Sequence, residues 1–133
     1  MVSMERSADW MDQAESDLSH AVHDMDAGYF EWSCFSSQQS AEKALKAVFQ
    51  KKGAAVWGHS VADLLDEVVK FSLIPKGLRV KALELDKAYI PTRYPDAHPS
   101  GSPRKRYTRR EASRLIENAR QIVVLCKSLL AQA

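Results

Sequence analysis

The sequence has few cysteines, few glycines and no long apolar run. Its two cysteines, Cys34 and Cys126, lie far apart in the 133-residue chain, which excludes the close spacing of a zinc site or a redox pair. No stretch of about 20 apolar residues is present to span a bilayer. The N-terminal stretch carries Glu5, Asp9 and Asp12, and these acids are unlike a secretory signal. We therefore expect a cytoplasmic protein without a membrane segment or a disulfide framework.

The composition is that of an ordinary globular protein, because 45% of the residues are hydrophobic and 27% are charged. A chain of this length can bury a core large enough to fold without a metal. Both cysteines also fall on apolar helical positions, which favours buried structural thiols in a reducing compartment. We expect one domain that spans residues 1–133.

Charge is distributed unevenly along the chain, although the formal net charge is only +2. Residues 1–27 are strongly acidic and contain Arg6 as their single basic residue, whereas residues 90–114 carry many arginines against Asp96 and Glu111. Such a basic segment focuses positive potential on one region of the surface. The pattern favours an anionic partner at residues 90–114.

Apolar residues recur at helical spacing in five segments. The first two run from about Ser7 to Ala27 and from Tyr29 to Lys52, and each is followed by a glycine. A third follows Ser60, which forms a capping signal with Asp63, and ends near Phe71. Pro75 is expected to open the fourth, and Thr108 with Glu111 forms a capping box for the last. No alternating strand pattern is found.

A proline-rich segment separates the last two of these helices. Between residues 90 and 108 lie Pro91, Pro95, Pro99 and Pro103, together with Gly101, which excludes a continuous α-helix. Loops of this length inside a domain are usually functional or disordered. The predicted fold is all-α, an up-and-down bundle of four or five helices with a long Pro-rich loop before the last helix.

Three segments of the chain resemble the fingerprint of the HEPN domain family. They are the run Gln38–Lys46, the pair His59 and Ser60, and the run Tyr89–Asp96, in family order. The resemblance implies a helical bundle that commonly forms homodimers. It also implies frequent pairing with a minimal nucleotidyltransferase as toxin and antitoxin.

The resemblance further implies a catalytic motif. Many family members cleave RNA without a metal through an Arg and a His separated by four to six residues, which Arg93 and His98 match. Tyr94 and Ser100 depart from the active pattern. They favour the alternative of a non-catalytic module that binds a nucleotide or a partner nucleotidyltransferase, and a third possibility is a structural dimeric adaptor.

The chemistry of these two side chains suits RNA cleavage. A histidine exchanges a proton near neutral pH, and an arginine binds phosphate through two parallel hydrogen bonds. Acid and base catalysis usually needs two proton-transfer groups, which a homodimer would supply. The structural alternatives are an ion pair of Arg93 with Asp86 or Asp96, and a His98 bonded to backbone.

The remaining candidate site residues would bind the phosphates and bases of RNA or a nucleotide. They are Tyr94, Asp96, Arg104, Lys105, Arg106, Tyr107, Arg109 and Arg110. The alternative is a solvated charged loop. Arg109 and Arg110 also fall in the first turn of a helix, where a bound anion would offset the unfavourable position of two cations.

Other polar residues are expected to have structural or solvent-exposed positions. His59 precedes a capping serine and is interpreted as a structural loop residue, and Glu42 and Lys46 are placed on an exposed or dimer-rim face. His20 and His23 share a helix face but lack further ligands, so they are expected in solvent. We expect no metal and no cofactor.

Overall fold

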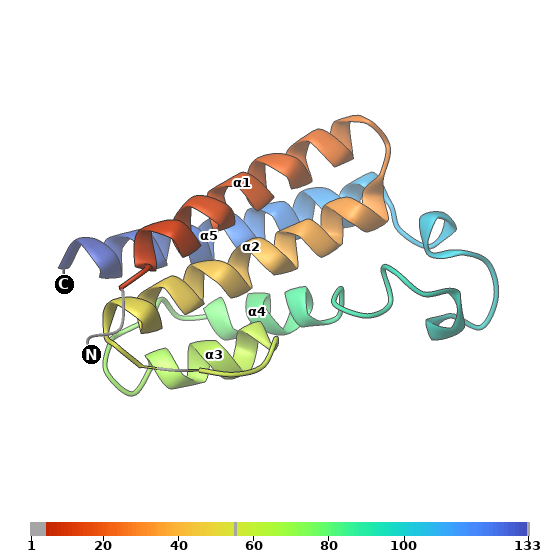
Figure 1. The fold of residues 1–133 in the computed structure, drawn as a ribbon. Coiled ribbons are helices and arrows are strands. Elements are labelled where there is room, and N and C mark those ends of the chain that lie inside the picture. The colour runs from red at the N-terminus through yellow and green to blue at the C-terminus, as the bar shows by residue number, and fades with distance from the viewer. Residues whose placement is uncertain (1–4, 55, 133) are drawn as a thin grey trace.

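The computed structural model describes residues 5–54 and 56–132, and over these residues the chain forms helices and loops without a strand (Figure 1). The five α-helices are α1 (Ser7–Asp26), α2 (Phe30–Lys51), α3 (Val61–Val68), α4 (Leu78–Asp86) and α5 (Arg109–Gln132). Figure 1 shows α1, α2 and α5 as long helices lying side by side, with the shorter α3 and α4 below α2. The expected all-α bundle is confirmed.

Local sequence signals set several helix ends as expected. Gly28 has a φ of 89°, a left-handed conformation that ends α1 and starts the turn into α2. The Ser60 hydroxyl accepts a hydrogen bond from the Asp63 amide at 3.1 Å. At α5, the Thr108 hydroxyl accepts from the Glu111 amide and the Glu111 carboxylate accepts from the Thr108 amide, each at 3.1 Å. This is the reciprocal capping box.

The fourth helix begins later than the sequence indicated. Pro75 lies in the preceding turn, and α4 starts at Leu78 after Gly77, whose φ is 86°. A left-handed residue there redirects the chain, so the helix cannot begin at the proline. The helix also ends at Asp86, which leaves Tyr89 in the following turns. The third helix ends at Val68 rather than near Phe71.

The segment before α5 contains no α-helix, as expected, but it is not irregular throughout. Single 3-10 turns form at η1 (Pro95–Ala97) and η2 (Pro103–Lys105). Each begins with a proline, whose fixed φ suits the first position of a helical turn. Figure 1 shows this loop projecting from one end of the bundle.

Helix α2 is the centre of the fold and contacts each of the other four helices. Small residues let α1 approach it closely: the hydroxyl of Ser33 donates to the Ala21 carbonyl at 2.7 Å, and that of Ser40 to the Ala14 carbonyl at 2.6 Å. Cys34 and Cys126 are fully buried, which confirms the expected structural thiols. Burial raises the pKa of Cys34 to about 12.

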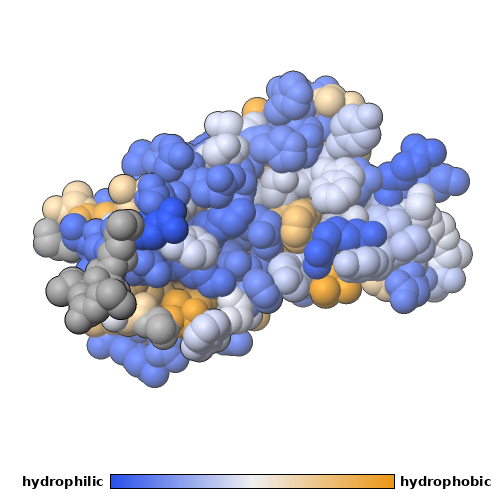
Figure 2. All heavy atoms as spheres, viewed as in Figure 1, coloured by the Kyte–Doolittle hydropathy of each residue, from blue (hydrophilic) through white to orange (hydrophobic). Residues whose placement is uncertain are grey.

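The face of the molecule drawn in Figure 2 is mostly polar. Figure 2 shows hydrophilic residues over most of one face, with hydrophobic residues as small separate spots. None of the described helices is long and apolar enough to cross a membrane.

Candidate functional site

The three segments that carried the family resemblance meet in space. The Gln38 side chain on α2 donates to the carbonyl of His59 at 2.8 Å, which holds the segment before α3 against the middle of α2. The Asp86 carboxylate at the end of α4 accepts from the Ser60 hydroxyl at 2.9 Å. It also accepts from the amides of Val61 at 2.6 Å and Ala62 at 3.0 Å, so it caps α3. These contacts place His59 beside Tyr89.

Arg93 lies among aromatic rings. Its Cζ atom is 4.5 Å from the ring centroid of Phe35, 4.9 Å from that of Tyr89 and 5.2 Å from that of Tyr94. Its Nε donates to the Tyr89 carbonyl at 2.9 Å. Cation–π contacts of this kind stabilise a guanidinium without neutralising it.

No carboxylate pairs with Arg93 within residues 5–54 and 56–132. The ion pair considered from the sequence does not form, because Asp86 is occupied by the start of α3 and Asp96 lies exposed in η1. Four other arginines, by contrast, each bond a carboxylate: Arg6, Arg79, Arg114 and Arg120. Arg93 therefore offers a positive charge to a ligand.

His98 is held by the loop itself. Its Nε2 lies 2.6 Å from the Pro91 carbonyl, and its ring meets the Tyr107 ring edge-on at 6.0 Å. A carbonyl only accepts hydrogen bonds, so Nε2 carries the hydrogen and Nδ1 is the nitrogen left for proton transfer. His98 therefore forms the backbone hydrogen bond that was considered as its structural role. The bond leaves Nδ1 of the ring without this partner, so Nδ1 can accept or donate a proton.

The basic residues occupy different positions. Arg104 and Lys105 are exposed in η2, and Arg110 is exposed at the start of α5. Arg106 folds back, its Nε donating to the Ser100 carbonyl at 2.7 Å. The guanidinium of Arg109 lies over the Phe30 ring at 5.2 Å.

The two tyrosines expected to stack on bases differ in exposure. Tyr94 is 49% exposed beside Arg93. Tyr107 is half-buried and packs against the hydrophobic core, and this burial raises its pKa to about 12. Tyr94 is therefore the accessible ring of the pair.

Sequence reasoning missed Glu42 and His59 as site residues. Glu42 was placed on an exposed face, but it is only 4% exposed because α2 is covered on most sides. One of its carboxylate oxygens lies 3.2 Å from Nδ1 of His59, and the other accepts from Lys46 at 3.2 Å. The His59 ring stacks on Tyr89 with a centroid distance of 4.9 Å. Glu42 and His59 both lie in segments that resemble the family fingerprint, and this was the sequence signal that could have identified them.

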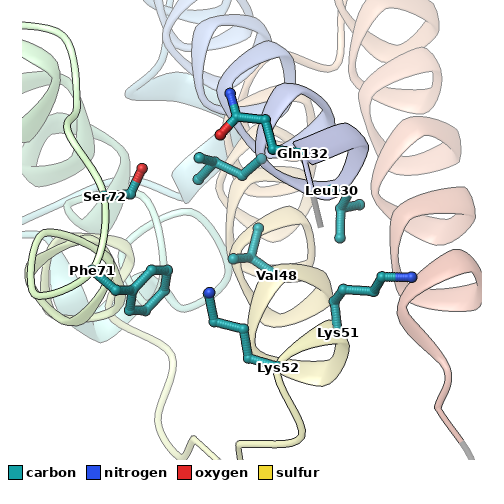
Figure 3. A pocket seen from close by; sticks show the side chains of 8 residues that line it. Val48, Lys51, Lys52, Phe71, Ser72, Leu130 and Gln132 are labelled. Carbon is teal, nitrogen blue, oxygen red and sulfur yellow. The ribbon is translucent and has the colours of Figure 1, made fainter.

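Two surface hollows lie on different parts of the molecule. One of about 350 Å³ adjoins His59 and is lined by Trp10, Lys46, Gln50, Ala54, Val56, Trp57, Gly58 and His59. The other, of about 160 Å³, lies between the ends of α2 and α5 and the segment after α3, where Figure 3 shows Lys52 beside Phe71 and Lys51 on the side of Leu130. The first hollow reaches the candidate site through His59, whose ring stacks on Tyr89. No three His, Cys, Asp or Glu side chains gather as metal ligands in the part of the chain described.

The chain is similar to known proteins over most of its length. The family model of the HEPN domain matches residues 7–129. The crystal structure of TT1696 from Thermus thermophilus has a TM-score of 0.91 and 42% identity, covering 95% of this chain and 99% of that chain. A HEPN domain protein from Thermotoga maritima is 52% identical with a TM-score of 0.77, covering 93% and 98%. The proposed toxin MJ1304 of Methanocaldococcus jannaschii is 26% identical over 129 residues, covering 90% and 85%.

Proposed function

Because the chain belongs to the HEPN domain family, we propose that it is a metal-independent endoribonuclease that acts as a dimer and as the toxin of a toxin–antitoxin pair. The observation that carries the proposal is Arg93, a cation on an aromatic cluster without a carboxylate partner in the described residues. The similarity of the chain to the proposed toxin MJ1304 supports the role as a toxin.

The reaction needs three contributions from the protein. One group removes a proton from the ribose hydroxyl, which then attacks the neighbouring phosphorus. Arg93 binds the phosphate and stabilises the charge that develops on its oxygens. His98, through Nδ1, exchanges a proton with the attacking or the leaving oxygen. The products are a cyclic phosphate and a free ribose hydroxyl.

The loop around this site suits a polyanion. Arg104 and Lys105 project into solvent, and Tyr94 exposes its ring next to Arg93. Lysine and arginine contacts to phosphates bind nucleic acid without regard to sequence, and an exposed ring stacks on a base. RNA binding along this loop would therefore weaken as salt is added.

The deciding experiment measures cleavage of an RNA oligonucleotide in the presence of a chelator. His98→Ala should lower the rate by about a hundredfold to ten-thousandfold, which is the usual loss of a general acid or base. Arg93→Ala should lower it by about a hundredfold to a thousandfold, which is typical for a lost donor to the transition-state charge. Arg93→Lys keeps the charge but loses the planar fork, so it should recover only part of the rate. The cleaved strand should end in a cyclic phosphate.

Arg120→Ala is the matched control, because this arginine only pairs with Glu117 on the surface of α5. It should cleave like the wild type, and circular dichroism should report the same helix content in every variant. A His98→Ala protein that cleaves at the wild-type rate would refute the role of His98.

The second candidate is a non-catalytic module that binds a nucleotide or a nucleotidyltransferase. Tyr94 and Ser100 favour it, since they stand where the active pattern has other residues. In the structure Ser100 accepts hydrogen bonds from Arg106. Binding of a nucleotide or a nucleotidyltransferase by a wild-type protein that never cuts RNA would establish this alternative.

A further inference from the structure

Glu42 is a buried carboxylate that the proposed reaction does not yet use. A buried charge is costly unless it is paired and hydrogen-bonded. Glu42 meets this need with three partners, the side chains of Gln38 at 3.4 Å, Lys46 at 3.2 Å and His59 at 3.2 Å. Two of them also lie on α2, so α2 alone could hold the carboxylate. The third ties it to a histidine from another segment.

The His59 ring is fixed on two sides. Its Nδ1 faces Glu42, and its plane stacks on Tyr89 with an angle of 17° between the rings. The side chain is nevertheless 57% exposed and lines the hollow of about 350 Å³ together with Trp10 and Trp57. A carboxylate that accepts from one ring nitrogen fixes the tautomer and leaves the other nitrogen, Nε2, for proton transfer.

Tyr89 contacts both this histidine and Arg93. The centroid of its ring lies 4.9 Å from the His59 centroid and 4.9 Å from the Cζ atom of Arg93. The imidazole and the guanidinium therefore share the Tyr89 ring as a neighbour, which puts both groups in one aromatic cluster. One chain thus carries two histidines near the candidate site, His59 and His98, where the sequence indicated one.

We propose that His59 is the general base of the reaction and that Glu42 is its positioning residue, an assignment that rests on the proposed ribonuclease function. His59 takes the proton of the ribose hydroxyl through Nε2, and the freed oxygen forms a bond to phosphorus. The bond from phosphorus to the leaving oxygen breaks, and protonated His98 gives its proton to that oxygen. The carboxylate of Glu42 stabilises the imidazolium formed on His59.

Two substrates distinguish the role of general base from the role of general acid. One is an RNA dinucleotide, and the other is the nitrophenyl ester of a ribonucleoside phosphate, whose leaving group departs without a proton. His98→Ala should be slow on the dinucleotide and near the wild-type rate on the ester. His59→Ala should be slowed about a hundredfold or more on both, because both need the base.

Glu42→Gln tests the positioning role with His59 still present. The amide oxygen can accept from Nδ1, so substrate binding should persist while the imidazolium loses its counter-charge. The expected result is a lower kcat with an unchanged KM, because the interaction is made in the transition state. A merely structural Glu42 would change neither constant in the fraction of protein that remains folded.

His23→Ala is the matched control, since this histidine is exposed on α1. Thermal unfolding checks that each variant is folded at the assay temperature. If the wild type cleaves and His59→Ala matches it on both substrates, the assignment of His59 is overturned and the proposed function stands. If the wild type cleaves neither substrate, both fail.

Discussion

Among single residues, Asp86 holds the site together. Its one carboxylate accepts hydrogen bonds from a hydroxyl and two amides at the start of α3. It therefore links the end of α4 to the segment that carries His59. Sequence alone offered Asp86 as an ion-pair partner of Arg93, because the spacing of seven residues does not reveal that the carboxylate turns toward α3.

Replacing Asp86 should destabilise the fold. Asp86→Ala leaves the first amides of α3 without their acceptor, and hydrogen bonds to a charged group contribute about 1.5 to 3 kcal/mol. We expect the free energy of unfolding in urea to fall by about 2 kcal/mol. Asp12→Ala, an exposed residue on α1, should change it little. Equal stability of the two variants would contradict the capping role.

At the scale of elements, α5 depends on the box at its first turn. Thr108 and Glu111 exchange hydrogen bonds there, and Arg109 and Arg110 add positive charge at the same helix end. The cap must therefore offset an unfavourable interaction of two cations with the helix dipole.

Thr108→Ala removes the side-chain acceptor of this box. Loss of an N-cap typically costs about 1 kcal/mol, and the midpoint of thermal or urea unfolding should fall accordingly. Ser113→Ala lies exposed within the same helix and should not lower stability, since alanine favours a helix interior. A midpoint unchanged by Thr108→Ala would show that α5 begins without this cap.

Helices were predictable from the sequence where a local signal marks them, and less so elsewhere. The glycine after α1 and the capping residues Ser60 and Thr108 act within a few residues, so their effects can be read directly. The start of α4 depends on the backbone conformation of Gly77, which the sequence does not state. Pro75 was a plausible but wrong start.

The site was predictable only in part, because burial of polar residues is a tertiary property. Arg93 and His98 came from a spacing along the chain, and their roles remain predictions. Glu42 looked exposed because a polar residue on a helix usually is. Its burial results from the segment carrying His59, which is seventeen positions further along the chain and covers that part of α2.

For the whole molecule, we propose that exposed aromatic residues near the site, the aromatic face, form the surface at which two copies of the chain would dimerise. Tyr29 and Trp32 are 57% and 47% exposed. Trp32 lies edge-on to Phe35, which itself contacts Arg93, so part of this face is continuous with the candidate site. Exposed aromatic residues of this kind are enriched at interfaces.

Trp32→Glu should shift the protein from dimer to monomer, because a buried unpaired carboxylate is strongly unfavourable at an interface. Light scattering at micromolar concentration measures the mass directly. Val124→Glu is the control, an exposed apolar residue on α5 outside the aromatic face. A wild-type monomer, or a dimer that survives Trp32→Glu, would contradict this surface.

The positions of the three tryptophans determine what fluorescence can report. Trp10 and Trp57 line the hollow beside His59, Trp32 stands next to Phe35, and the buried hydrophobic core contains none of them. Trp57 is 90% exposed, so its indole emits from water in the folded protein as well. Intrinsic emission will therefore respond to a molecule that enters the hollow or covers the aromatic face. Unfolding of the helical core, by contrast, will change the tryptophan emission mainly through Trp10, because the side chain of Trp10 packs against the outside of the core.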